Sequence, residues 1–228
     1  MRMFYRIEYK GFENIPERGP VLIISNHASY LDGVILQAIC KRPVRFVIDQ
    51  YIYDMPVINY FMRHNRAIPI LPKKESVEHA LEGVSRGLEE GDVICIFPEG
   101  RLTYTGHLGR FKPGIEWVIE RDPVPIFPVA IDGLWGGIFS RKYLHSRWRW
   151  IPKGIRPKVK VVCGEVIHPG HVRVDYLQRV IMNYCTQCDS TNFFISDANR
   201  GMSKSVWPTW SKKCASLGSL AAMSIRRP

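Results

Sequence analysis

Short apolar runs alternate with stretches of helical periodicity along most of this chain. The runs have the length of β-strands and lie at residues 20–25, 44–49, 66–71, 92–97, 125–131 and 158–163. Alternation of strands with helices is typical of an α/β domain. We therefore expect a mixed, largely parallel sheet flanked by helices, with ligand sites at the carboxyl ends of its strands.

Helices are predicted between several of these runs. Residues 75–90 carry apolar side chains at helical spacing, which is typical of a half-buried helix. A second helix is expected near Asp32, and a third begins at Pro113, because proline suits the first helical position. Residues 171–184 favour a closing helix, and the weak periodicity beyond it predicts a loosely ordered extension to residue 228.

The net charge of the chain indicates what kind of binding partner to expect. The chain has 228 residues, of which 32 are Lys or Arg and 21 are Asp or Glu, a formal net charge of +11. This excess favours an anionic partner, namely a membrane surface, a nucleic acid or a phosphorylated substrate. No apolar run reaches the roughly eighteen residues of a spanning helix, and residues 1–6 lack the apolar core of a signal peptide. We therefore expect a cytoplasmic protein.

The cysteines give little sign of a metal or redox site. Cys95 and Cys163 lie inside apolar runs, which predicts small buried residues rather than disulfides. Cys185 and Cys188 form a single CxxC pair, whereas a structural zinc site usually needs a second pair of ligands. We expect no metal.

A histidine and an aspartate stand close together directly after the first apolar run. His27 can take a proton from a hydroxyl near neutral pH. Asp32, hydrogen-bonded to the far ring nitrogen, would fix the tautomer of the imidazole and stabilise its charged form. Five helical steps leave two side chains roughly 140° apart, so we expect His27 on the loop and Asp32 in the first helical turn. The pair is also consistent with an ordinary helix start capped by Ser25 or Asn26.

A second polar segment follows the run at 92–97. Gly100 permits close approach of a ligand to the backbone. Arg101 is suited to bind phosphate in a fork, and Glu99 to hold a hydroxyl or to orient Arg101. An ordinary surface turn with an ion pair is the alternative. Lys112 precedes a predicted helix start, where its charge and free backbone amides attract phosphate, although a solvated surface lysine is as good an explanation.

Residues 135–160 combine basic and aromatic side chains without an acidic residue. The cations are Arg141, Lys142, Arg147, Arg149, Lys153, Arg156, Lys158 and Lys160, and the aromatic residues are Trp135, Phe139, Tyr143, Trp148 and Trp150. Such a mixture suits anionic lipid at a membrane interface. It also suits nucleic acid, whose bases stack on aromatic rings, or a basic surface loop around partly buried tryptophans.

The two polar segments, in this order, resemble the motifs of the glycerolipid acyltransferase family, whose best-known members acylate lysophosphatidic acid. The family's NHxxxxD block matches at His27 and Asp32, and its FPEG block matches at Phe97 to Gly100. Residues 124–129 resemble the family's proline-containing strand. The resemblance covers roughly residues 6–168.

The resemblance implies an acyltransferase domain over residues 1–170, followed by the closing helix and extension at 171–228. It implies transfer of a fatty acyl group from acyl-coenzyme A or acyl carrier protein to a hydroxyl of a lysophospholipid. His27 would be the general base, Asp32 its orienting partner, and Glu99 to Arg101 would engage the acceptor. No cofactor is implied, because the thioester is already activated. The expected partner is lipid rather than nucleic acid, at the inner face of the membrane as a peripheral protein.

Two departures from the family pattern concern the acceptor. Arg101 follows Gly100 directly, whereas many members have threonine before the arginine. This variant is more similar to the acyltransferase domain of bacterial bifunctional enzymes that reacylate 2-acyl-glycerophosphoethanolamine. The family's second block corresponds to residues 65–70, which lack its acidic–arginine pair and leave Arg66 as the expected acceptor contact. Both lysophosphatidic acid and lysophosphatidylethanolamine are therefore candidate acceptors, and a non-catalytic lipid-surface binding module of the same fold is the alternative function.

Overall fold

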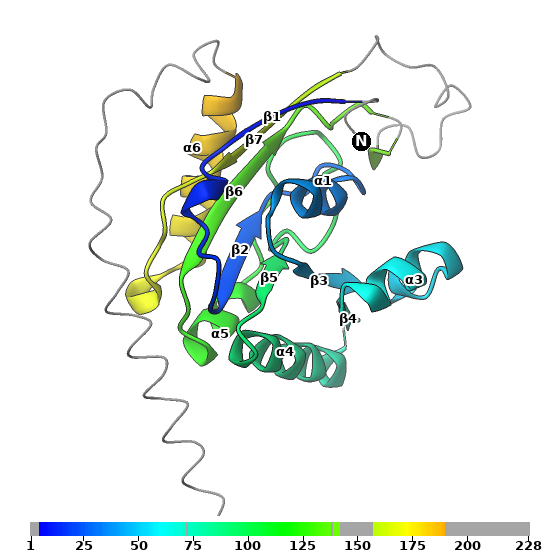
Figure 1. The fold of residues 1–228 in the computed structure, drawn as a ribbon, viewed down its shortest axis with the longest axis vertical. Coiled ribbons are helices and arrows are strands. Elements are labelled where there is room, and N and C mark those ends of the chain that lie inside the picture. The colour runs from blue at the N-terminus through cyan, green and yellow to red at the C-terminus, as the bar shows by residue number, and fades with distance from the viewer. Residues whose placement is uncertain (1–4, 72, 138, 142–156, 190–228) are drawn as a thin grey trace, which may run out of the picture. The chain divides into compact units, whose positions relative to one another are not determined.

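The computed structural model describes residues 5–71, 73–137, 139–141 and 157–189. Its centre is a seven-stranded sheet with the strand order β1-β7-β6-β2-β5-β3-β4 (Figure 1). The strands are β1 (Arg6–Lys10), β2 (Val21–Ser25), β3 (Val44–Asp49), β4 (Ile68–Ile70), β5 (Val93–Ile96), β6 (Ile126–Asp132) and β7 (Lys158–Cys163). Neighbouring strands are parallel except for the antiparallel pair β6 and β7. The predicted mixed, largely parallel sheet is confirmed.

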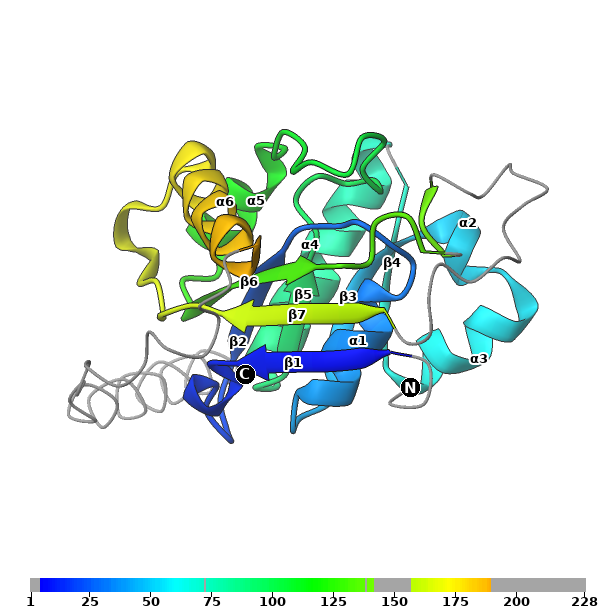
Figure 2. The ribbon, with the colours of Figure 1, turned by 90° about the horizontal axis from the view of Figure 1, so that it is seen from above.

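Helices cover both faces of this sheet (Figure 2). They are α1 (Asp32–Ile39), α2 (Gln50–Tyr53), α3 (Pro56–His64), α4 (Lys74–Glu89), α5 (Gly114–Arg121) and α6 (Val174–Asp189), with short 3-10 turns η1 (Phe12–Asn14) and η3 (Pro169–His171). Helices α4, α5 and α6 share one apolar core with the sheet, and α1 belongs to the core on the opposite face. The four predicted helices are all present, whereas β1, α2 and α3 were not predicted.

The central strand β2 illustrates how the core is built. Its residues are all buried, because β5 and β6 flank it and helices cover both faces. Val21 and Ile23 face the core that contains α1, and Leu22 and Ile24 face the core that contains α4, α5 and α6. This alternation is the two-residue period of a strand buried on both sides.

The parallel pairing of β2 with β5 decides where the functional segments meet. Ile24 pairs with Ile96, so the two strands end at the same edge of the sheet. The loop from residue 26 to 31 and the loop from 97 to 113 therefore leave side by side. The closing helix α6 belongs to the same compact unit, Met1–Thr191.

Two segments about which the sequence made predictions lie wholly or partly outside the described residues. This applies to the predicted extension from residue 190 onward and to residues 142–156 of the basic and aromatic segment. Across the described ranges, no helix is both long and apolar enough to cross a bilayer. Over the same ranges, no group of three His, Cys, Asp or Glu side chains is placed to hold a metal ion.

Candidate active site

The structure brings His27 and Asp32 together at the junction between β2 and α1. The Nδ1 atom of His27 lies 2.8 Å from Oδ2 of Asp32. The same oxygen accepts the backbone N–H groups of Ala28, at 2.7 Å, and Ser29, at 2.9 Å. The Asp32 side chain is fully buried, and its Oδ2, which accepts two backbone N–H groups, acts as an acceptor toward Nδ1 as well. Nδ1 of His27 therefore carries its proton toward Asp32, which leaves Nε2 to accept one.

Stacking against an aromatic ring also holds the imidazole of His27 in place. His27 stacks on Phe97, with ring centroids 4.2 Å apart and planes 16° from parallel. Phe97 in turn lies nearly parallel to Phe46 on β3, at 6.4 Å. The side chain of His27 is 20% exposed, so the ring is fixed by its neighbours and still reaches the surface.

Asn26 fixes the loop that carries His27. Its amide nitrogen donates to the carbonyl of Ile131 on β6, and its amide oxygen accepts the N–H of the same residue, both at 2.8 Å. The side chain thus pairs with β6 as a peptide unit would. The alternative in which Ser25 or Asn26 caps α1 is wrong, because Leu31 holds the cap position without a side-chain hydrogen bond. Sequence reasoning missed this role, since it depends on a strand about a hundred residues away.

Glu99 joins two loops rather than contacting Arg101. Its Oε1 accepts the backbone N–H of His27 at 2.8 Å, and its Oε2 accepts that of Gly109 at 2.7 Å. The residue is only 4% exposed. Burial raises the pKa of the Glu99 carboxyl, and the two backbone N–H groups partly oppose that shift. Both oxygens therefore position the backbone around His27.

Glycines at two positions let these loops approach closely. A Cβ atom on Gly109 would lie 2.5 Å from Oε2 of Glu99. Gly100 has a φ of +63°, and a Cβ atom there would lie 2.5 Å from Nζ of Lys112. The backbone N–H of Lys112 donates to the carbonyl of Pro98 at 2.8 Å. Lys112 therefore lies directly over the turn that contains Glu99 and Gly100.

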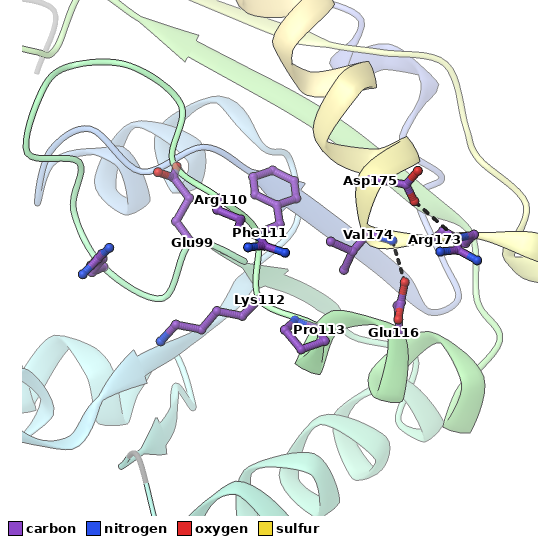
Figure 3. A pocket seen from close by; sticks show the side chains of 10 residues that line it. Glu99, Arg110, Phe111, Lys112, Pro113, Glu116, Arg173, Val174 and Asp175 are labelled. Carbon is purple, nitrogen blue, oxygen red and sulfur yellow. Dashed lines mark hydrogen bonds and ion pairs between the residues drawn. The ribbon is translucent and has the colours of Figure 1, made fainter.

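Two cavities open beside these residues and share Glu99. The first has a volume of about 290 Å³ and contains His27; apolar side chains from β6, the following loop and α6 contribute to its wall, among them Ile131, Trp135 and Met182. The second, of about 610 Å³, is shown in Figure 3 and is lined by four cations, Arg101, Arg110, Lys112 and Arg173. The acidic residues of its wall are Glu99, Glu116 and Asp175.

Those acidic side chains already have partners. Glu116 accepts the backbone N–H of Val174 at 2.7 Å, and Asp175 pairs with Arg173 at 3.4 Å (Figure 3). Glu99 is engaged by the two loops described above. The cations Arg101, Arg110 and Lys112 therefore give the second cavity its electrostatic character.

The structure does not bring Arg66 to this site. Arg66 lies two residues before β4, and its guanidinium pairs with Glu90 and with Asp92, the residue before β5. His27 and Glu99 follow the carboxyl ends of β2 and β5, whereas Arg66 and Asp92 precede the amino ends of β4 and β5. Because these strands are parallel, Arg66 lies at the opposite end of the strands from His27. The expected contact between Arg66 and the acceptor has no support in this geometry.

Comparison with known proteins places the fold and the motifs in a family. A family model described as Acyltransferase matches residues 6–132. The chain is 30% identical over 133 residues to a chloroplastic 1-acyl-sn-glycerol-3-phosphate acyltransferase of Arabidopsis thaliana, which covers 57% of this chain and 37% of that protein. It is 32% identical over 161 residues to a probable 1-acyl-sn-glycerol-3-phosphate acyltransferase of Mycoplasma genitalium, which covers 68% of this chain and 59% of that protein. The chain thus spans less than two thirds of each relative.

A solved structure agrees with this placement at the level of the fold. The 1-acyl-sn-glycerophosphate acyltransferase PlsC from Thermotoga maritima superposes with a TM-score of 0.67 at 21% identity, over 82% of this chain and 74% of that one. The family match runs from β1 to the end of β6 and includes His27, Asp32 and the Phe97–Arg101 turn. The resemblance found in the sequence is confirmed, and this chain belongs to the acyltransferase family.

Proposed function

We propose that this chain is an O-acyltransferase that moves a fatty acyl group from a thioester to a hydroxyl of a lysophospholipid. The observation that carries the proposal is the contact of 2.8 Å between Nδ1 of His27 and Oδ2 of Asp32. It directs the basic Nε2 away from Asp32, and His27 lines the smaller cavity. The relatives named above are 1-acyl-sn-glycerol-3-phosphate acyltransferases, which supports the same chemistry here.

The reaction follows from these two side chains. Nε2 of His27 takes the hydroxyl proton as the acceptor oxygen attacks the thioester carbonyl. The carbon–sulfur bond then breaks, and the departing thiolate receives that proton from the imidazolium. Asp32 stabilises the imidazolium between the two proton transfers. A positioned general base of this kind contributes on the order of a hundredfold to ten-thousandfold in rate.

The larger cavity suits the head group of the acceptor. Both candidate acceptors, lysophosphatidic acid and lysophosphatidylethanolamine, carry a phosphate, and Arg101 and Lys112 supply charge-assisted donors in one pocket. Glu99 lines both cavities, so the head-group pocket adjoins the one that contains His27. Binding the head group there holds the acceptor hydroxyl near the base and reduces the entropic barrier.

The proposed cellular setting is peripheral attachment to the inner face of the membrane. A lipid acceptor and the formal charge of +11 both favour contact with anionic lipid. The donor in this setting is acyl-coenzyme A or acyl carrier protein. A non-catalytic lipid-surface binding module is the alternative, and the ordered contacts of His27, Asp32 and Glu99 argue against it.

An acceptor panel with purified protein tests the proposal. Release of free thiol is measured with lysophosphatidic acid and with lysophosphatidylethanolamine, each combined with acyl-coenzyme A and with acyl carrier protein. We expect release that depends on the acceptor, and a higher acceptor KM for Lys112→Gln. The control is Lys41→Gln, which removes an exposed lysine outside both cavities. Absence of release in every combination would overturn the proposal and favour the binding module.

A further inference from the structure

Three loops that are distant in sequence join at the carboxyl edge of the sheet, and together we call them the three-loop rim. They are residues 26–31, residues 97–113, and residues 133–137 with 139–141. The N–H of Thr103 donates to the carbonyl of His27 at 2.9 Å, which links the first loop to the second.

The third loop is tied to the other two. The N–H of Tyr30 donates to the carbonyl of Phe139 at 3.3 Å, and Ser29 and Ser140 form an isolated β-bridge. Gly106 packs against Trp135, since a Cβ atom there would lie 2.5 Å from the indole. The rim is therefore one connected surface.

Each loop of the rim exposes one large aromatic side chain. Tyr30 is 41% exposed, Tyr104 is 57% exposed and Phe139 is 46% exposed. Aromatic rings of this kind concentrate at membrane–water interfaces, where the ring lies at the level of the lipid head groups. Exposed aromatic side chains on connected loops are typical of a surface that binds a partner or a membrane.

The charge of the rim is of one sign. The only acidic residue in its three loops is Glu99, which is buried and engaged by backbone N–H groups. The guanidinium carbon of Arg141 lies 3.8 Å from the centre of the Tyr104 ring, and that of Arg101 lies 5.4 Å from it. A cation over an aromatic ring keeps its charge available to lipid phosphate while the ring keeps the side chain in place.

The rim also forms part of the wall of the smaller cavity. His27, Gly106 and Trp135 contribute to its wall, one from each loop. A surface placed against the rim would therefore lie beside the cavity that contains His27.

We propose that the three-loop rim docks on the surface of an anionic bilayer. This inference rests on the proposed function, because the occupant is taken to be the membrane that supplies the lipid acceptor. Docking there delivers the acceptor from the head-group layer to the cavity, with the arginines contacting lipid phosphates and the aromatic rings inserted among the head groups.

Vesicle sedimentation with the full chain tests the rim. Protein is mixed with phosphatidylcholine vesicles that contain or lack phosphatidylglycerol, and the bound fraction gives a partition coefficient. We expect binding that requires phosphatidylglycerol. The double variant Phe139→Ser/Arg141→Gln should lower the partition coefficient roughly tenfold, because each cation or interfacial aromatic contributes a few-fold.

The matched control is Trp117→Ser/Arg121→Gln, which removes an exposed aromatic and an arginine one turn apart on α5. We expect it to bind as the unmodified protein does. Equal loss in both double variants, no loss in the rim variant, or tighter binding to RNA than to the vesicles would overturn the proposal.

Thiol release with short-chain monomeric substrates and no vesicles is measured in parallel. If the unmodified protein releases no thiol in this assay, the proposed function is refuted. The vesicle result tests only whether the rim docks on the bilayer.

Discussion

Oδ2 of Asp32 lies 2.8 Å from Nδ1 of His27 and also accepts the N–H groups of the two residues that follow the histidine. The backbone of the loop that carries His27 therefore holds the Asp32 carboxylate in place, and this carboxylate in turn orients the imidazole of His27. Asp32→Asn should keep much of this geometry, because an amide oxygen can replace Oδ2, but it removes the negative charge that stabilises the imidazolium. We expect kcat to fall about a thousandfold or more, with little change in the acceptor KM.

The control for this variant is Asp122→Asn, at the end of α5, where the carboxylate accepts the hydroxyl of Ser85 at 2.6 Å. Steady-state kinetics on both proteins, with circular dichroism to confirm folding, make the comparison. Near-normal kcat for a folded Asp32→Asn protein would show that the pair does not act as a base and its partner.

Glu99→Gln distinguishes a positioning residue from an acceptor ligand. The glutamine has one acceptor oxygen, so either His27 or Gly109 loses a hydrogen bond to its backbone N–H. We expect the free energy of unfolding to fall by about 1–3 kcal/mol and kcat to fall at least several-fold, while the acceptor KM stays nearly constant. A raised KM at unchanged kcat would instead assign Glu99 to acceptor binding. Glu120→Gln, an exposed residue on the same domain, serves as the control.

A matched pair of glycines tests the close approach of the second loop to Glu99. Gly109→Ala puts a methyl group 2.5 Å from Oε2 of Glu99, whereas Gly114→Ala places one in open space at the start of α5. We expect Gly109→Ala to destabilise the protein by about 1–3 kcal/mol and to lower kcat. Gly114→Ala should be neutral or stabilising by up to about 1 kcal/mol. Urea unfolding measures both, and equal effects would contradict the contact.

The raised pKa of Glu99 predicts how its contribution depends on pH. Burial makes the folded protein hold this proton more tightly than the unfolded chain does. The resulting contribution to stability is fully present below the unfolded pKa and is lost as the pH rises through the folded pKa. The difference in unfolding free energy between the unmodified protein and Glu99→Gln should therefore be largest at acidic pH and shrink toward neutrality. A difference that grows with pH in urea titrations would contradict this assignment.

Much of the fold follows from the hydrophobic pattern. Buried strands such as β2 are continuous apolar runs, and α4 repeats its apolar residues at helical spacing. The edge strand β1 alternates charged with apolar residues over only five positions, Arg6–Lys10, which is a weak signal. Helix α2 has only four residues and none of them is buried, so packing left little periodic trace in its sequence. Helix α3 spans nine residues directly after it, a short window for recognising a helical period.

The site was predictable in its residues and less so in its contacts. The placement of His27 on a loop and Asp32 in the first helical turn follows from helix geometry. The pairing of Asn26 with Ile131 and of Glu99 with Gly109 depends on loops and strands that meet only in the folded chain. Local sequence favoured an ion pair between Glu99 and Arg101, but tertiary structure gives Glu99 two backbone partners instead.

The most direct test of the proposed acyl transfer is the rate of thiol release by His27→Ala with the best acceptor and donor from the panel. The substitution removes the base and leaves Glu99 and the cationic cavity in place. We predict a loss of kcat of at least about a hundredfold in a folded protein, with binding of the acceptor preserved in a separate equilibrium measurement. Near-normal release by purified His27→Ala would contradict the central claim that His27 is the general base of an acyltransferase.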